Sequence, residues 1–441
     1  MIDRFVLMKT RDIYDLISGQ YFQRYDLNEE SRILSKVTSQ FEQLYSREPF
    51  IYEILDKAFF KLNERIIKKG KNLLYGKDLE WFFNIGQYLF YNYWQWMKNF
   101  TLDTNNNSLF VEIENFIEKW WTTFLSFKAM ESETRKNLPP PKKILLELTN
   151  NCNLNCIMCA VGKNGYDPVR NMSLDLLNNL CENNFKDTEL IRLNGLGEST
   201  ILPNFNAYLG ILGELPAQLE IVTNLTVNNT KIWDQLIYYN TNFLISCDSS
   251  SPQLFESIRR GSNFKIFRKN LSYIGNNVSD PLQAQLIFTL MEMNIHELSK
   301  VVQLAVDLNL GGVIVNVVKS DKNEWMNVKY EEIIKEFEKA YQISRSSGLK
   351  LKLPDHLGKT PINKLISNRS CQFSCKNPWE EVYIRYNGDL TVCNMLNPYI
   401  YGNCKNQPFM ELWNGLNAYM FREFVNTKYR HYYCKDCYYL V

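Results

Sequence analysis

The chain has 441 residues, of which 45% are hydrophobic and 22% charged, and its formal net charge is +2. This composition predicts a globular, soluble protein of two or three domains, and the small net charge gives no electrostatic reason to expect nucleic acid as a partner. Because no run of 18 apolar residues and no signal-peptide pattern occur, we expect no membrane association. Eleven cysteines without an export signal favour metal ligation in a reducing, cytoplasmic compartment over disulfides.

Residues 1–137 are expected to form a mainly helical domain. An aromatic-rich helical stretch covers residues 88–97, and a further helix is predicted over residues 109–127 after the polar loop 103–108. The aromatic side chains could form a substrate-binding surface, but packing between helices is the interpretation that we favour. The proline run 139–141 forms a stiff extended joint that ends this region.

From Lys142 onward, predicted strands alternate with helical stretches such as 174–183 and 295–308. Repeated strand–helix units imply a parallel sheet with right-handed crossovers, and six units are too few for a closed eight-stranded barrel. The sequence therefore predicts an α/β domain over residues 142–325, followed by a linker or helical segment at 326–370. The strand candidates are residues 144–148, 189–194, 219–223, 242–247, 284–290 and 312–318.

Three closely spaced cysteines, Cys152, Cys156 and Cys159, follow the first of these strands. Thiolates suit iron–sulfur clusters and zinc, and three thiolates leave one iron of a four-iron cubane open for a ligand. A loop directly after a strand of an α/β sheet is also where such folds usually bind ligands. A structural zinc site is the alternative, but zinc requires four ligands and no fourth candidate lies nearby in the sequence.

This spacing and its strand context resemble the radical S-adenosylmethionine (radical SAM) superfamily. The resemblance implies a partial (β/α)6 barrel over residues 142–325, with an open cluster iron that chelates S-adenosylmethionine. In that family the reduced [4Fe–4S] cluster cleaves the cofactor to a 5′-deoxyadenosyl radical. The residue before the last cysteine is often aromatic in the family. Here it is Met158, whose backbone is expected to contact adenine.

The loop after the second predicted strand is similar to the Gly-Gly-Glu-Pro motif of the same superfamily. Gly195, Gly197 and Glu198 match the motif, whereas Leu196 and Ser199 depart from it. The motif's backbone receives the methionine amino group, and glycine permits the close approach that this contact requires. A plain turn is the alternative interpretation of this segment.

The resemblance assigns further cofactor contacts to the region after the fourth predicted strand. Polar side chains there bind the ribose in the family, and Ser246 and Asp248 are the candidates. Arg259 or Arg260 could reach the cofactor carboxylate, and we take Arg259 as the candidate. A solvated pair of surface arginines is the alternative.

A second group of cysteines lies in the C-terminal region, where a hairpin is predicted. Residues 382–386 and 390–393 read as two strands joined by a turn at Asn387-Gly388, which would bring Cys375 and Cys393 close together. A helix is predicted from Phe409 through Arg422. The cysteines of this region are Cys371, Cys375, Cys393, Cys404, Cys434 and Cys437.

This cysteine and glycine pattern resembles the SPASM/Twitch extension of radical SAM enzymes, which binds auxiliary iron–sulfur clusters. The full pattern continues with further cysteines where this sequence ends, so we expect a small Twitch-like domain at residues 371–441 with one auxiliary [4Fe–4S] cluster. Cys371 or Cys404 could replace one ligand, and a structural zinc site on the same thiolates is the alternative. The expected ligands are Cys375, Cys393, Cys434 and Cys437.

The expected reaction is abstraction of a hydrogen atom from a C–H bond, with the auxiliary cluster assisting oxidation. We expect a small polar substrate, such as a sugar, aminocyclitol or nucleotide-sugar, and an electron donor such as flavodoxin or ferredoxin. A maturase of a ribosomally made peptide is the alternative, although such enzymes often begin with a three-stranded peptide-recognition domain. An iron–sulfur carrier is a third class. No general base is assigned, because none of the three histidines lies at a predicted strand end.

Overall fold

The computed structural model describes residues 138–159, 170–318, 330–354, 374–394 and 399–427, together with a few single positions. The chain divides into two compact units, one made of residues 1–137 and 419–435 and the other of residues 138–418 and 436–441. The predicted helical domain of residues 1–137 lies almost entirely outside the described residues. The described helices and strands lie mainly in the second unit.

A ten-stranded sheet forms the core of this unit, in the order β12-β11-β10-β1-β3-β4-β5-β7-β8-β9. The pairing is parallel from β10 through β9, as repeated strand–helix units predict. The predicted α/β class is therefore confirmed, and the six predicted strands are all present. Their bounds are β1 Lys143–Leu146, β3 Leu190–Leu193, β4 Gln218–Thr223, β5 Asn242–Ser246, β7 Ala284–Leu290 and β8 Gly312–Val317. A further parallel strand, β9 (Lys350–Lys352), extends the sheet beyond β8.

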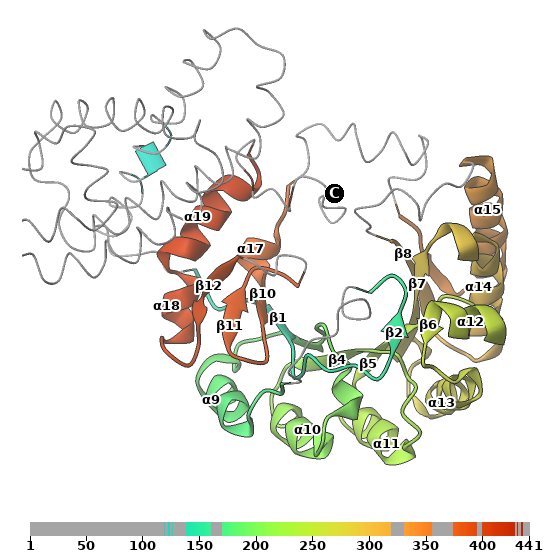
Figure 1. Ribbon diagram of the computed structural model, residues 1–441, viewed down its shortest axis with the longest axis horizontal. Coiled ribbons are helices and arrows are strands. Elements are labelled where there is room, and N and C mark those ends of the chain that lie inside the picture. Colours follow the sequence, from blue (N-terminus) through green and yellow to red (C-terminus); the bar gives the residue numbers. More distant parts are fainter. Residues whose placement is uncertain are drawn as a thin grey trace, which may run out of the picture. The chain divides into compact units, whose positions relative to one another are not determined.

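The helices of this unit run along one face of the sheet (Figure 1). Side-chain oxygens of Ser173, Asn229 and Asn263 accept a backbone N–H at the start of α9, α11 and α13, as N-capping residues do. The single helix predicted over residues 295–308 is instead a 3-10 turn at Glu292–Glu297 followed by α14. The helices are α9 Leu174–Asn184, α10 Phe205–Gly213, α11 Thr230–Tyr238, α12 Pro252–Ile258, α13 Phe264–Asn277, α14 Leu298–Asp307 and α15 Tyr330–Ser347.

The two faces of the sheet differ in chemistry because side chains alternate along each strand. Ile144 and Ile191, which pair across β1 and β3, are fully buried on the helix-covered face. On the opposite face, the pairing aligns Leu145, Arg192 and Glu220, and the last two form an ion pair. The inner face of the sheet therefore carries charged groups, whereas the outer face packs apolar side chains against helices.

The C-terminal hairpin is present as predicted and joins the edge of the main sheet. Strand β10 (Glu381–Ile384) pairs in parallel with β1 and antiparallel with β11 (Asp389–Thr391). Gly388 has a φ of +90° at the turn, a conformation that favours glycine. Strand β12 (Ile400–Asn403) continues this antiparallel extension, and the short helix α17 (Asn377–Glu380) precedes β10.

The prediction of one continuous helix from Phe409 through Arg422 is wrong. The structure has two helices, α18 (Phe409–Trp413) and α19 (Leu416–Val425). Asn414 caps the first one, and its side-chain Oδ1 accepts the backbone N–H of Leu138 at 2.9 Å. Gly415 follows directly, and glycine is a poor helix former. The chain therefore turns between α18 and α19.

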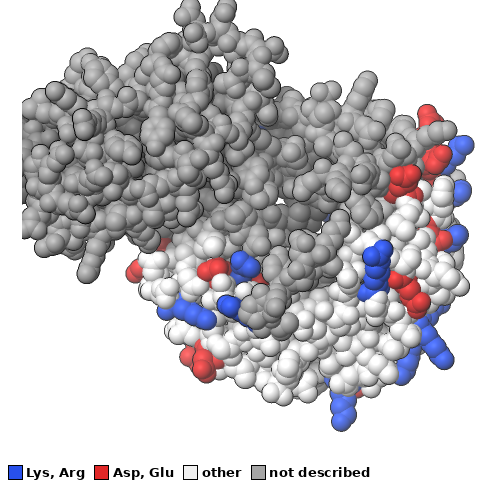
Figure 2. Space-filling view, viewed as in Figure 1, with Lys and Arg blue, Asp and Glu red and all other residues white. Residues whose placement is uncertain are grey.

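Charged side chains of both signs are scattered over the described part of the surface seen in Figure 2. No patch of a single sign gathers on that part of this face. None of the helices within the described ranges has the length and apolarity needed to cross a membrane.

Candidate active site

The cysteine-bearing loop begins directly after β1 and is fastened to the segment that follows β5. Within it, β2 (Asn155–Cys156) pairs antiparallel with β6 (Arg259–Arg260) (Figure 1). The register of this pair places Cys156 opposite Arg259. The backbone N–H of Ile157 donates to the carbonyl of Ile258 at 3.0 Å. The loop is thus held by its own main chain at the carboxyl ends of the strands, where α/β folds bind ligands.

The three predicted cluster ligands differ in burial: Cys156 is buried, whereas Cys152 and Cys159 are half-buried. Burial raises the pKa of the Cys152 thiol to about 11 and also raises the pKa of Cys156, where the Arg259 guanidinium opposes the effect. The amide nitrogen Nδ2 of Asn224 lies 3.9 Å from the Cys152 sulfur. An N–H group and a cation beside the sulfurs are the surroundings that a thiolate-ligated iron–sulfur cluster uses.

The donor set and its surroundings therefore fit a [4Fe–4S] cluster. In the described part of the chain, no three metal-ligating side chains already converge on one point.

The two predicted motif glycines pack against the cysteine loop and the strand that precedes it. A Cβ atom on Gly197 would lie 2.4 Å from the carbonyl oxygens of both Thr149 and Asn151. A Cβ atom on Gly195 would lie 2.5 Å from Cγ of Glu147. A side chain at either position would clash with these atoms, so both positions require glycine. The contact with the methionine amino group stays a prediction.

Glu198 supports this loop from within the protein. Its carboxylate is buried and accepts hydrogen bonds from the hydroxyl of Thr200 at 2.6 Å, the hydroxyl of Thr223 at 2.8 Å and the backbone N–H of Asn224 at 2.7 Å. Its backbone N–H donates to the carbonyl of Asn151 at 2.7 Å. Burial raises the pKa of Glu198, and these hydrogen bonds oppose that effect. The side chain therefore joins the loop after β3 to the end of β4.

The predicted ribose and carboxylate contacts lie at the end of β5. Ser246 is half-buried, while Asp248 and Arg259 form a buried ion pair with 2.7 Å between their oxygen and nitrogen atoms. Asp248 also accepts the backbone N–H of Thr289 at 2.8 Å. Arg260 is exposed. The structure thus pairs Asp248 with Arg259, and the cofactor contacts assigned to these two residues stay predictions. Met158 is half-buried, and its contact with adenine also stays a prediction.

The C-terminal cysteines fall at different ends of the hairpin. Cys393 follows Thr391, the last paired residue of β11, and so lies at the end of the hairpin opposite the turn. The chain enters β10 at this same end, after Cys375 and α17. The backbone N–H of Cys404 instead donates to the carbonyl of Gly388 at the turn. The turn end and the opposite end of the hairpin are four strand residues apart, which corresponds to roughly 13 Å. Cys404 is therefore poorly placed to replace Cys393 as a ligand. Cys434 is buried in the other unit, and Cys371 and Cys437 lie outside the described residues.

A model of the radical SAM superfamily matches residues 146–305, and a model of the SPASM iron–sulfur cluster-binding domain matches residues 375–438. The chain belongs to the radical SAM superfamily and carries a SPASM domain. It is accordingly an enzyme that uses S-adenosylmethionine and [4Fe–4S] clusters, and the alternative of an iron–sulfur carrier is not retained.

Two curated proteins resemble this radical SAM enzyme over most of their length. One is the tungsten-containing aldehyde ferredoxin oxidoreductase cofactor-modifying protein of Pyrococcus furiosus, 22% identical over 327 residues, covering 67% of this chain and 87% of that protein. The other is the AdoMet-dependent heme synthase of Methanosarcina barkeri, 22% identical over 305 residues, covering 64% of this chain and 84% of that protein.

Among solved structures, Streptococcus suis SuiB shares the fold. Its complex with S-adenosylmethionine has a TM-score of 0.52 at 14% identity, covering 69% of this chain and 71% of that one. Its complex with the precursor peptide SuiA has a TM-score of 0.54 at 15% identity, covering 73% of each chain. At these identities the likeness concerns the fold, and it confirms the α/β architecture.

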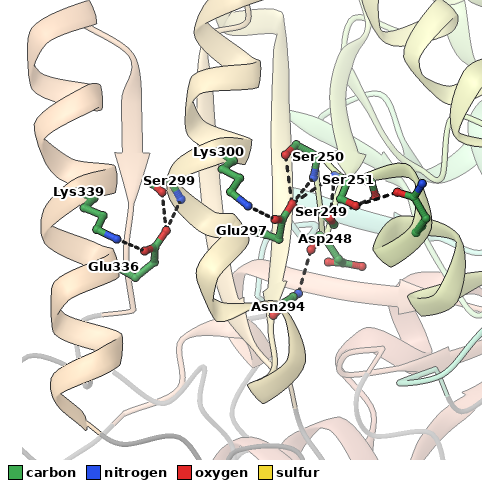
Figure 3. Close-up of polar contacts among 11 residues, drawn as sticks. Asp248, Ser249, Ser250, Ser251, Asn294, Glu297, Ser299, Lys300, Glu336 and Lys339 are labelled. Carbon is green, nitrogen blue, oxygen red and sulfur yellow. Dashed lines mark hydrogen bonds and ion pairs between the residues drawn. The ribbon is translucent and has the colours of Figure 1, made fainter.

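The radical SAM domain also contains a supporting carboxylate that the sequence did not reveal, Glu297. Oxygen Oε2 of Glu297 accepts hydrogen bonds from the hydroxyl of Ser249 at 2.7 Å and from the backbone N–H groups of Ser250 at 3.0 Å and Ser251 at 3.2 Å (Figure 3). Oxygen Oε1 accepts a hydrogen bond from Lys300 at 2.6 Å. Burial alone raises the pKa of Glu297, but these hydrogen bonds outweigh it and lower the pKa to about 2.

This network fixes the loop that follows Ser246 and Asp248. Asn294 adds to it, because its side-chain amide donates to the backbone carbonyls of Asp248 at 3.1 Å and Thr289 at 2.9 Å. The available signal in the sequence was the run of three serines, whose hydroxyl and amide donors need an acceptor.

Proposed function

We propose that this radical SAM enzyme removes a hydrogen atom from a C–H bond of a small polar substrate, of the sugar, aminocyclitol or nucleotide-sugar type, and so initiates its oxidation. The observation that carries the proposal is the joining of three loops at the carboxyl ends of the strands. Glu198 N–H donates to the carbonyl of Asn151, and Ile157 N–H donates to the carbonyl of Ile258. The loops after β1 and β3 and the segment after β5 are therefore joined to one another, which supports a shared cofactor site at this edge of the sheet.

Each loop would supply one part of the cofactor site. Cys152, Cys156 and Cys159 would hold the cluster, which when bound supplies the electron that cleaves S-adenosylmethionine to methionine and a 5′-deoxyadenosyl radical. The backbone of the Gly195–Gly197 loop would receive the methionine amino group, and Ser246 would bind the ribose. Asp248 and Arg259, already paired at 2.7 Å, would hold the loop after β5 against the cysteine loop.

The inner face of the sheet supports a polar substrate. Its aligned positions include the ion pair between Arg192 and Glu220, with side chains that are 31% and 13% exposed. Glu381 of β10 lies on the same face, and burial raises its pKa. Charged side chains in a partly enclosed space need polar partners to be stable. A polar substrate could supply such partners, whereas an apolar substrate could not.

The SPASM domain would supply the auxiliary [4Fe–4S] cluster that assists the oxidation. Cys375 and Cys393 lie at one end of the hairpin, and we propose that Cys434 and Cys437 complete the ligand set. A flavodoxin or ferredoxin would serve as the electron donor. The names of the two curated relatives, a cofactor-modifying protein and a heme synthase, also support a small-molecule substrate.

A maturase of a ribosomally made peptide is the second candidate. The observation in its favour is the similarity to SuiB bound to its precursor peptide, with a TM-score of 0.54. Native anSMEcpe with bound AdoMet and Cp18Cys peptide also has a similar fold, with a TM-score of 0.51 at 15% identity, covering 68% of this chain and 88% of that one.

Deuterium transfer distinguishes these candidates. Anaerobically reconstituted enzyme is reduced with dithionite and incubated with S-adenosylmethionine and extracts of fully deuterated cells, separated into small-molecule and peptide fractions. Deuterium appearing in 5′-deoxyadenosine with the small-molecule fraction alone supports the proposal, and its appearance with the peptide fraction alone supports the second candidate. Absence of 5′-deoxyadenosine from the fully reconstituted enzyme would contradict both.

A further inference from the structure

A buried carboxylate, Glu147, lies between β1 and the cysteine loop and contacts two different parts of the enzyme. Its side chain has no exposed surface. Oxygen Oε2 accepts the backbone N–H of Leu196 at 2.8 Å and also accepts the hydroxyl of Tyr383. Leu196 belongs to the loop after β3, whereas Tyr383 belongs to β10 of the SPASM domain, 236 residues from Glu147 along the chain.

On the first side, Glu147 determines where the glycine loop lies. The space that a side chain at position 195 would occupy is filled by Glu147, whose Cγ and Cβ atoms would lie 2.5 Å and 2.7 Å from a Cβ atom added to Gly195. Leu196 is the residue between the two motif glycines, so its hydrogen bond to Oε2 orients the amides of this short segment. A hydrogen bond to a charged acceptor is stronger than a neutral one.

On the second side, the contact reaches the strand that the SPASM cysteines flank. Tyr383 is 2% exposed, and the backbone N–H of Glu147 donates to the carbonyl of Ile384 at 2.9 Å. Cys375 precedes β10 and Cys393 follows its partner strand β11. One carboxylate oxygen therefore joins the glycine loop to the strand between two proposed auxiliary-cluster ligands.

A cation that directly follows the same strand also lies near Glu147. Nε of Arg385 lies 3.7 Å from Oε1, within ion-pair distance, and the Arg385 side chain is 15% exposed. A carboxylate without solvent contact is stable as an anion only when a cation and hydrogen-bond donors compensate it. Both Arg385 and Tyr383 come from the SPASM hairpin, so the side-chain partners of Glu147 depend on the position of that hairpin.

We propose that Glu147 is a positioning residue through which the SPASM strand β10 sets the affinity of the radical SAM domain for S-adenosylmethionine. The proposal rests on the proposed function only in assigning the methionine end of the cofactor to the Gly195–Gly197 loop. The SPASM domain then has a role in the first half of the reaction that is separate from its own cluster.

The test compares Glu147→Gln and Tyr383→Phe, singly and together, with the wild type. Tyr208→Phe is a matched control, because the hydroxyl of the buried Tyr208 donates to the carbonyl of Met172 at 2.6 Å and not to Glu147. The measurements are the Kd for S-adenosylmethionine, read from the change in the electron paramagnetic resonance spectrum of the reduced cluster, and separate KM and kcat values for its cleavage.

Each single variant should bind S-adenosylmethionine on the order of tenfold more weakly, the change expected for one lost charge-assisted hydrogen bond. KM should rise more than kcat falls. The double variant should be no worse than Glu147→Gln, because the two residues act through one contact. Tyr208→Phe should match the wild type in affinity even though it also loses a buried hydrogen bond.

The following outcomes decide between this inference and its alternatives. Equal Kd values for Tyr383→Phe, Tyr208→Phe and the wild type would overturn the inference, and so would additive effects of the two substitutions. If Glu147→Gln does not fold, as judged by iron content and circular dichroism, Tyr383→Phe alone decides, because it leaves the carboxylate in place. Wild-type enzyme that neither binds nor cleaves S-adenosylmethionine would instead contradict the proposed function.

Discussion

Gly197 offers the sharpest test of how the glycine loop and the cysteine-bearing loop are held together. In Gly197→Ala, the new Cβ would lie 2.4 Å from the carbonyl oxygens of Thr149 and Asn151 and 2.9 Å from the backbone nitrogen of Asn151. All three atoms belong to the backbone of the cysteine-bearing loop or its approach, so no flexible side chain can move aside. The two loops must therefore separate.

The size of the separation follows from these distances. Ordinary contact begins near 3.4 Å, so the loops must move apart by about 1 Å. That movement stretches the hydrogen bond from Glu198 N–H to the Asn151 carbonyl, which is 2.7 Å long in the wild type. Overpacking of this kind costs typically about 1–3 kcal/mol in stability, and a misplacement of about 1 Å lowers catalytic rates about 100-fold.

The assay is the rate of 5′-deoxyadenosine formation by reduced, reconstituted enzyme, with iron content and thermal unfolding measured on the same samples. Gly210→Ala is the control, because a Cβ atom at that position of α10 meets nothing within 4 Å. It should cleave S-adenosylmethionine normally and gain about 0.5–1 kcal/mol in stability from better helix propensity. A Gly197→Ala enzyme with wild-type cleavage and wild-type stability would refute the reasoning.

Three further outcomes are expected. Replacing the three loop cysteines by Ala should abolish 5′-deoxyadenosine formation and lower the iron content from about eight to about four per chain, measured by iron analysis. Replacing Cys375 and Cys393 by Ala should leave reductive cleavage of S-adenosylmethionine intact but abolish formation of the oxidised product, both measured by chromatography. A normal product yield would contradict an electron-accepting auxiliary cluster. Because the pKa of Glu297 falls from 4.5 to about 2 on folding, its ionised form stabilises the protein above pH 4.5 and this contribution disappears as the pH falls toward 2. Urea denaturation should show Glu297→Gln to be less stable at pH 7, by at most about 3 kcal/mol, with the difference narrowing in acid.

The architecture was largely predictable because it depends on local patterns. Buried apolar runs separated by amphipathic helices specify strands and crossovers, and Asn387-Gly388 specifies a tight hairpin turn. The cysteine spacing is equally local, since the three proposed ligands of one cluster come from one short loop. The break between α18 and α19 was missed although Asn414-Gly415 is a local signal, because the amphipathic pattern continues across it.

The partners of the buried charges could be found only in the tertiary structure. Glu297 meets Ser249 across 48 residues, and Glu147 meets Tyr383 across 236 residues. Alternation along a strand tells which side chains share a face, but it does not tell which strands are neighbours or in what register they pair. The sequence alone thus determined the elements and the cysteine loop. The sheet order, with β10 beside β1, decided which carboxylates support that loop, because a buried charge is stable only where distant segments bring it a partner.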